Sequence, residues 1–149
     1  MLRTVLAVLL ASALLVVSLP VVDSARVTHA ERSVDTTLQR LDAAATELAA
    51  GNDALPPGRA GARRQHTLRL PRRSWGSAEL ESLRFPAPSA EQPVRFRVAG
   101  GQETAARFSV PVVGPPGGLT LQSGGRHRVV LRLQQREGRP VVVVSRADV

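Results

Sequence analysis

The chain has 149 residues and no cysteine, and its formal net charge of +8 comes from 20 basic residues that are all arginine. This length allows one small domain besides terminal segments, and the lack of cysteine excludes disulfides and thiolate metal sites. Residues 1–57 carry four Arg against six carboxylates, whereas residues 58–149 carry 16 Arg against six. We therefore expect a basic C-terminal domain that attracts anions, although an arginine-only basic set is also typical of a GC-rich genome.

Near the N-terminus, 19 uncharged residues run from Thr4 to Val22 and include twelve Leu or Val. As a helix they would extend about 28 Å, close to the ~30 Å hydrocarbon thickness of a bilayer. Two interpretations stay open for residues 1–25: a retained transmembrane anchor, which we favour, or a signal peptide cut near Ala25. The small-residue pattern before that cut is imperfect, because Asp23 occupies one of its positions.

The next segment, residues 26–51, has the apolar spacing of an amphipathic stalk helix, with a bend expected upstream at Pro20. Steps of three and four residues join Val27, Ala30, Val34, Leu38, Leu41, Ala45 and Leu48. Gly51 supplies a stop signal. The stripe either packs on the core of the chain's own β-domain or pairs with a partner helix.

A linker at residues 52–64, rich in Pro and Gly, precedes a predicted β-domain at 65–149, where the apolar period changes to two. Strands are expected at 66–70, 94–98, 107–113 and 118–122, followed by a closing hairpin with a turn at Glu137 and Gly138 and a return over 141–144. The expected fold class is α+β: a membrane and stalk helix followed by a small antiparallel β-sandwich or partial barrel of about six strands.

Three further local features carry expectations. Ser77 to Phe85 is expected to form a short helical turn capped by Ser77. Pro111 belongs on an edge strand or a bulge, because it has no N–H for a central strand, and residues 114–118 form a loop. Trp75 is either a core plug or a membrane-interface anchor.

No catalytic constellation is evident. The histidines at 29, 66 and 127 lack metal-binding spacing, and there is no nucleophile elbow, no phosphate-binding Gly-rich loop and no tyrosine. The carboxylate pair Glu79 and Glu81 lies in the predicted surface turn. We therefore expect a non-enzymatic protein with no catalytic residue, no cofactor and no metal.

The arginines are the one feature with binding chemistry. The candidate partner-contact residues are Arg63, Arg64, Arg69, Arg72, Arg73, Arg95 and Arg97. The plainest interpretation is a solvated face; an acidic protein partner or anionic lipid headgroups come next. Nucleic acid is the least favoured, because one Trp and three Phe offer few stacking platforms.

The segments MLRTVLAVLLASALLVVSLPVVDSAR, GARR followed by LRLPRRSW, and GRHRVVLRL are similar to an uncharacterised family of short haloarchaeal proteins with one N-terminal membrane segment. The order of parts also resembles type IV pilin-like subunits. The resemblance implies a location at the membrane rather than an activity. It also implies an association with type IV pilus-like machinery. We expect a single-pass membrane protein whose extracytoplasmic β-domain binds a partner, or alternatively a secreted binding domain released by cleavage.

Overall fold

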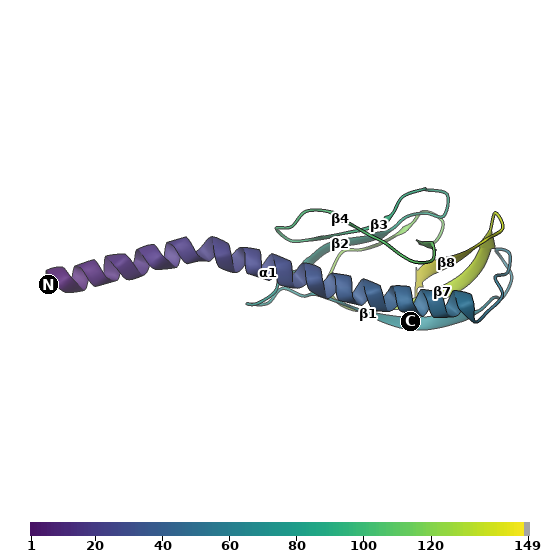
Figure 1. Cartoon of the computed structure of the whole chain (residues 1–149), viewed down its shortest axis with the longest axis horizontal. Helices are drawn as coiled ribbons and strands as arrows, with labels where there is room; N and C mark the ends of the chain where they lie inside the picture. The colour runs from purple at the N-terminus through teal and green to yellow at the C-terminus, as the bar shows by residue number, and fades with distance from the viewer. Residues whose placement is uncertain (148–149) are drawn as a thin grey trace.

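The computed structural model describes residues 1–147, so the last two residues of the predicted β-domain, 148–149, lie outside the described residues. One long helix precedes eight strands (Figure 1). The elements are α1 (Leu2–Ala50), β1 (Arg63–Leu70), β2 (Leu80–Phe85), β3 (Val94–Val98), β4 (Thr104–Ala106), β5 (Val112–Val113), β6 (Leu119–Leu121), β7 (Gly125–Arg136) and β8 (Arg139–Arg146).

The strands form two four-stranded sheets. The first has the order β1-β7-β8-β5 and the second β4-β3-β2-β6. Every pairing is antiparallel except that of β5 with β8, which is parallel. The predicted α+β class, with a long helix ahead of a small and mostly antiparallel β-domain, is confirmed, although the described residues hold eight strands where about six were expected.

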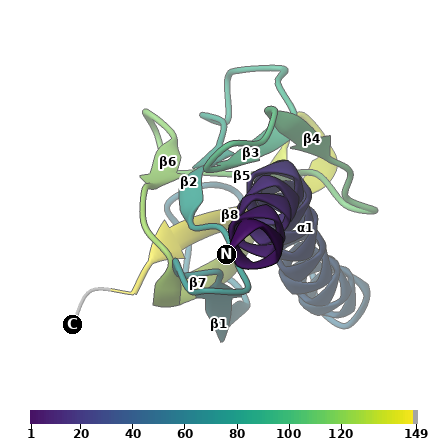
Figure 2. The same cartoon turned by 90° about the vertical axis from the view of Figure 1, so that its left-hand side faces the viewer.

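The C-terminal half of α1 fills one side of the core between the two sheets. Figure 2, which looks along α1, shows β3 and β4 on one side of the helix and β1 and β7 on the other. The predicted apolar stripe faces this core: Ala30, Val34, Leu38, Leu41, Ala45 and Leu48 are buried and Val27 packs against them. Of the two alternatives for the stripe, the structure therefore supports packing on the chain's own β-domain.

The helix passes Pro20 without interruption and has its C-cap at Gly51. Pro20 has no N–H to donate to the preceding turn, and Figure 1 shows α1 changing direction gently in its N-terminal half. The expected bend is thus shallow, and the helix that leaves the apolar segment is the same one that enters the core.

The expected helical turn at Ser77 to Phe85 is wrong, because Leu80–Phe85 is strand β2 in the second sheet. A register shift lies between Leu80 and Ser82, so that Leu80, Leu83 and Phe85 all become buried. A bulge adds one residue to a strand, which gives the inward residues a helix-like spacing of three. A helical turn and a bulged strand therefore share this spacing of buried residues.

The strand expected at 107–113 is much shorter, since only Val112–Val113 pairs with β8. Pro111 directly precedes this edge strand, in the kind of position expected of it, and its carbonyl accepts a hydrogen bond from the Val142 N–H at 2.9 Å. The closing hairpin is confirmed: Glu137 and Gly138, both with positive φ, join β7 to β8.

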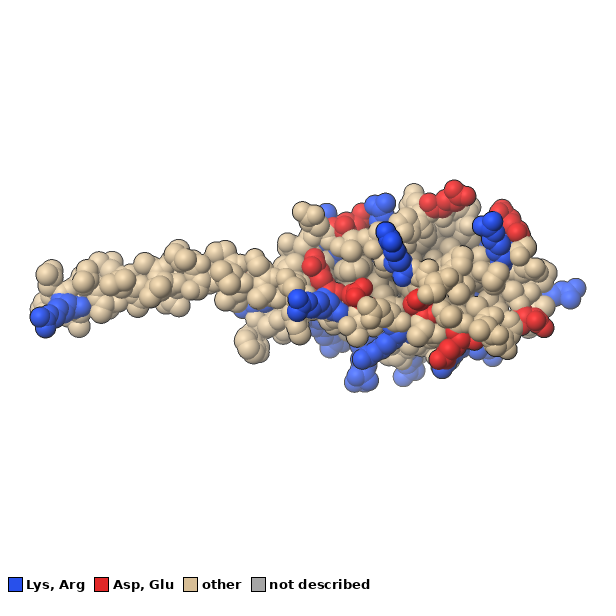
Figure 3. All heavy atoms as spheres, viewed as in Figure 1, with Lys and Arg blue, Asp and Glu red and all other residues tan. Residues whose placement is uncertain are grey.

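The N-terminal half of α1 has no partner in the described chain. Every residue from Met1 to Val22 is exposed, and this part of α1 is long and apolar enough to cross a membrane. Figure 3 shows it as a rod with one basic side chain near its tip, whereas charge of both signs covers the domain. Such a contiguous apolar surface is larger than soluble monomers usually expose.

Candidate functional site

The outer face of the first sheet is the most basic surface of the domain. Side chains alternate along β7, so that Val129, Leu131 and Leu133 face the core while the even-numbered residues face outward. Among the outward arginines of the two strands, the exposed ones are Arg63 and Arg69 on β1 and Arg126, Arg128 and Arg132 on β7. We call these five residues the arginine face. In Figure 3, basic side chains project along the lower edge of the domain, where Figure 1 places β1.

Two pairs on the arginine face set like charges directly across from each other. Arg63 is the register partner of Arg132, and Arg69 is the partner of Arg126. The strands β1, β7 and β8 contain no Asp or Glu, and none of the three ion pairs within residues 1–147 includes these four arginines. Like charges opposite each other on a sheet destabilise it, so this face carries a charge that an anionic partner would neutralise.

The end of the face far from the apolar segment borders a polar hollow of about 510 Å³, lined by Gly58, Arg59, Ala60, Gly61, Arg63, Arg132 and Gln134. The linker forms one wall, because the Gln135 N–H donates to the Leu55 carbonyl at 2.8 Å. Guanidinium groups match carboxylates and phosphates with two parallel hydrogen bonds, so the hollow suits an anion.

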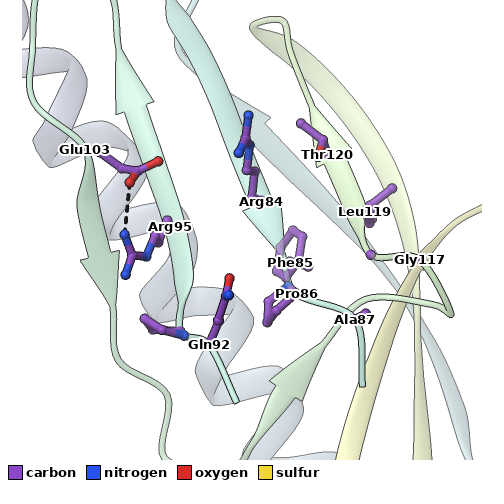
Figure 4. Close-up of a pocket in the computed structure, with 12 residues that line it drawn as sticks. Arg84, Phe85, Pro86, Ala87, Gln92, Arg95, Glu103, Gly117, Leu119 and Thr120 are labelled. Carbon is purple, nitrogen blue, oxygen red and sulfur yellow. Dashed lines mark hydrogen bonds and ion pairs between the residues drawn. The ribbon is translucent and has the colours of Figure 1, made fainter. Parts of the chain in front are cut away.

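The second sheet also has outward arginines, but a carboxylate partly neutralises their charge. Arg84 and Arg95 are cross-strand partners, and the Arg95 Nη1 lies 3.1 Å from the Glu103 Oε2. Figure 4 shows Arg95 turned toward Glu103, with Arg84 and Thr120 on neighbouring strands of a hollow of about 280 Å³. This face therefore has mixed charge, unlike the arginine face.

The structure divides the seven predicted partner-contact residues among three places. Arg63 and Arg69 belong to the arginine face, while Arg95 and Arg97 lie outward on β3, in the second sheet. Arg64 points the other way and pairs with Glu47 of α1 at 2.6 Å. Arg72 and Arg73 lie in the loop after β1, at the end of the domain near the apolar segment.

Sequence reasoning missed Arg84, Arg126, Arg128 and Arg132. The signal for the last three was present, because the alternation that puts Val129 and Leu131 inward places the even-numbered arginines outward. Arg84 was hidden by the misassigned turn. The Arg63 and Arg132 pair needed the register between β1 and β7, which no local pattern carries.

One histidine lies where α1 covers β1. His66 is half-buried and lines a small hollow with Thr37 and Arg40 of the helix. Burial lowers the pKa of His66 from its ordinary value of 6.5, and the nearby Arg64 charge lowers it further. Both effects disfavour the charged imidazolium, so this site couples the helix–sheet contact to pH.

The model of one protein family, a domain of unknown function called DUF7311, matches residues 1–147. No curated protein and no solved structure matches the chain significantly. The match includes the apolar segment, the rest of α1 and both sheets, so these parts are features of one family unit. The prediction of an uncharacterised family is confirmed at that level, and the chain belongs to the DUF7311 family.

Proposed function

We propose that the protein is a non-enzymatic, single-pass membrane protein whose extracytoplasmic β-domain binds an acidic protein partner through the arginine face. A haloarchaeal source and a role beside a type IV pilus-like or other cell-surface assembly are parts of this proposal, and they rest on the resemblance in sequence and layout. The observation that carries the proposal is the fully exposed apolar half of α1, which continues unbroken into the packed half.

The distance of the arginine face from the membrane end of α1 favours a protein partner over lipid headgroups. Thr37 donates to the Arg69 carbonyl at 2.8 Å, and Glu47 pairs with Arg64. These helix residues are 15 and 25 positions beyond Val22, or about 22 and 38 Å along the axis at 1.5 Å per residue. With the helix along the bilayer normal, the pair Arg63 and Arg132 lies too far from the surface for lipid phosphates.

Retention of the apolar segment is favoured over its removal by the surroundings of the candidate cleavage site. Residues 23–25 lie inside α1, and the next residue, Arg26, contacts the loop after β1 through its side chain and its carbonyl. A cut after Ala25 would make Arg26 the first residue of the chain, so its contacts with the loop would lie at a helix terminus that has lost its preceding turn. A secreted domain freed by cleavage is the alternative function.

Fractionation with mass spectrometry separates these two functions. We expect the chain in alkaline-washed membranes to retain residues 4–22. A mature chain that starts at Ala25 or Arg26 and is recovered in the soluble fraction would refute the anchor and establish the secreted form.

The side of the membrane is tested with a single introduced cysteine, because the native chain has none. Gln102 lies exposed between β3 and β4, so a Gln102→Cys variant offers one reactive thiol. In intact cells we expect a membrane-impermeant maleimide to label it. Labelling only after lysis would reverse the orientation.

Partner chemistry is tested with a defined acidic probe. The full chain in nanodiscs of zwitterionic lipid is titrated with a fluorescent oligoglutamate peptide, and anisotropy is measured. We expect the double variant Arg63→Gln, Arg132→Gln to weaken binding by about tenfold or more, since a charge-assisted hydrogen bond contributes about 1.5–3 kcal/mol.

The matched control changes the same number of charges on the other sheet. We expect Arg84→Gln, Arg97→Gln to retain nearly full affinity, because Glu103 already moderates the charge there. Equal losses in both double variants would mean that only net charge matters, and no loss in either would leave the arginine face as solvated surface.

A further inference from the structure

Trp75 is the exception among the exposed apolar side chains. Within residues 1–147, every exposed large hydrophobic residue lies between Met1 and Val22 except Trp75, which is 89% exposed. The core-plug interpretation of this tryptophan is therefore wrong. A single exposed apolar side chain is ordinary on a protein surface, so what marks Trp75 is its position relative to the apolar segment.

Trp75 sits at the tip of a tight loop between β1 and β2, closed by a bridge between Ser74 and Ser77. The loop is tied to α1, because the Arg26 Nε donates to the Trp75 carbonyl and the Ala78 N–H donates to the Arg26 carbonyl at 3.2 Å. Arg26 is one turn beyond Val22, about 6 Å along the axis at 1.5 Å per residue. The loop thus lies level with the end of the apolar segment.

The charges around the loop suit a headgroup layer. Arg73 is exposed and has no ion-pair partner within residues 1–147, while Arg72 lies over Gly125. The acidic neighbours are Asp23, whose Oδ1 is 3.4 Å from the Arg26 Nη1, and Glu79. Figure 2 shows this end of the domain viewed from the side of the apolar segment, the side on which a bilayer would lie.

We propose that Trp75 inserts into the interface of the bilayer that α1 spans, with Arg73 beside a lipid phosphate, so that the β-domain has a second contact with the membrane. Indole rings concentrate at this depth, because they are apolar with one N–H donor. This inference rests on the proposed membrane anchor. Its consequence is a fixed orientation of the domain, with the hairpin turn between β7 and β8 directed away from the bilayer (Figure 1).

The test uses Trp75 itself, which is the only tryptophan of the chain. The full chain is reconstituted into vesicles of equal parts phosphatidylcholine and phosphatidylglycerol, and quenching by acyl-chain-brominated lipids is measured. We expect blue-shifted emission and the strongest quenching from bromines nearest the headgroups. If the chain floats with the vesicles but Trp75 is not quenched, this inference fails while the anchor stands. If the chain does not float, the anchor itself fails.

A charge reversal tests the arginine. We expect Arg73→Glu to lower the ratio of docked to undocked loop by about fivefold or more in the mixed vesicles, since each basic residue near an anionic surface contributes such a factor. The control Arg139→Glu makes the same charge change at the hairpin between β7 and β8, far from the bilayer, and should leave Trp75 quenching unaltered. Circular dichroism checks that both variants are folded. Equal quenching in both variants would overturn the role of Arg73.

Discussion

His66 ties the stability of the contact between helix and sheet to pH. Its pKa is lowered from 6.5 in the folded chain, first by burial and then by Arg64, so the unfolded chain binds the proton more readily. Stability therefore rises with pH in the window that begins at the lower folded pKa and ends near 6.5. We expect the free energy of unfolding to fall as the pH drops through this window, as measured by urea titrations followed by circular dichroism in detergent.

The control for this prediction is His29, which is exposed on α1, the helix that covers β1. His66→Gln should remove much of the decline below pH 6.5, because glutamine has no charge to gain. His29→Gln should retain it. A decline that persists in the His66 variant would assign the effect to other groups.

At the scale of the elements, Asp42 holds α1 to the segment that precedes β5. Its two carboxylate oxygens accept hydrogen bonds from the Ser109 N–H and hydroxyl, each at 2.8 Å. Asp42→Ala leaves both donors without this partner, and we expect the free energy of unfolding to fall by about 1–3 kcal/mol. Asp35, which is exposed and within residues 1–147 accepts a side-chain hydrogen bond from Gln39 alone, is the matched site, and Asp35→Ala should cost about 0.5 kcal/mol or less. Equal losses would reject a special role for Asp42.

Elements with uninterrupted periodicity were predictable from the sequence, and those that depend on distant contacts were not. The helix stripe and the alternation of Val94, Phe96 and Val98 each follow one period, and both face the core as expected. The bulge in β2 breaks the period of two, so the strand resembled a helical turn. Residues 107–111 were expected to pair as a strand, yet Ser109 is bonded to a helix residue 67 positions away.

The candidate site was predictable in part for the same reason. Arginine alternation marks Arg95 and Arg97 as outward, and the structure agrees. The opposition of Arg63 and Arg132 arises from pairing between strands more than 60 residues apart, which needs the fold. Exposure of Trp75 also depends on the fold, because a lone Trp between polar residues fits a core or a surface equally well.

For the whole molecule, the continuous helix α1 sets the height of the β-domain above the bilayer. Changing the length of α1 tests this. Seven helical residues, mostly Ala with one Glu and one Lys, inserted between Val22 and Asp23 would lift the domain by about 10 Å and rotate it by only about 20° from two full turns. We expect vesicle flotation and domain stability to be unchanged and Trp75 quenching by brominated lipids to be lost. The same insert between Arg3 and Thr4 lengthens the chain without moving the domain and should preserve quenching. Quenching that survives the first insert would mean that α1 does not set the height of the domain above the bilayer.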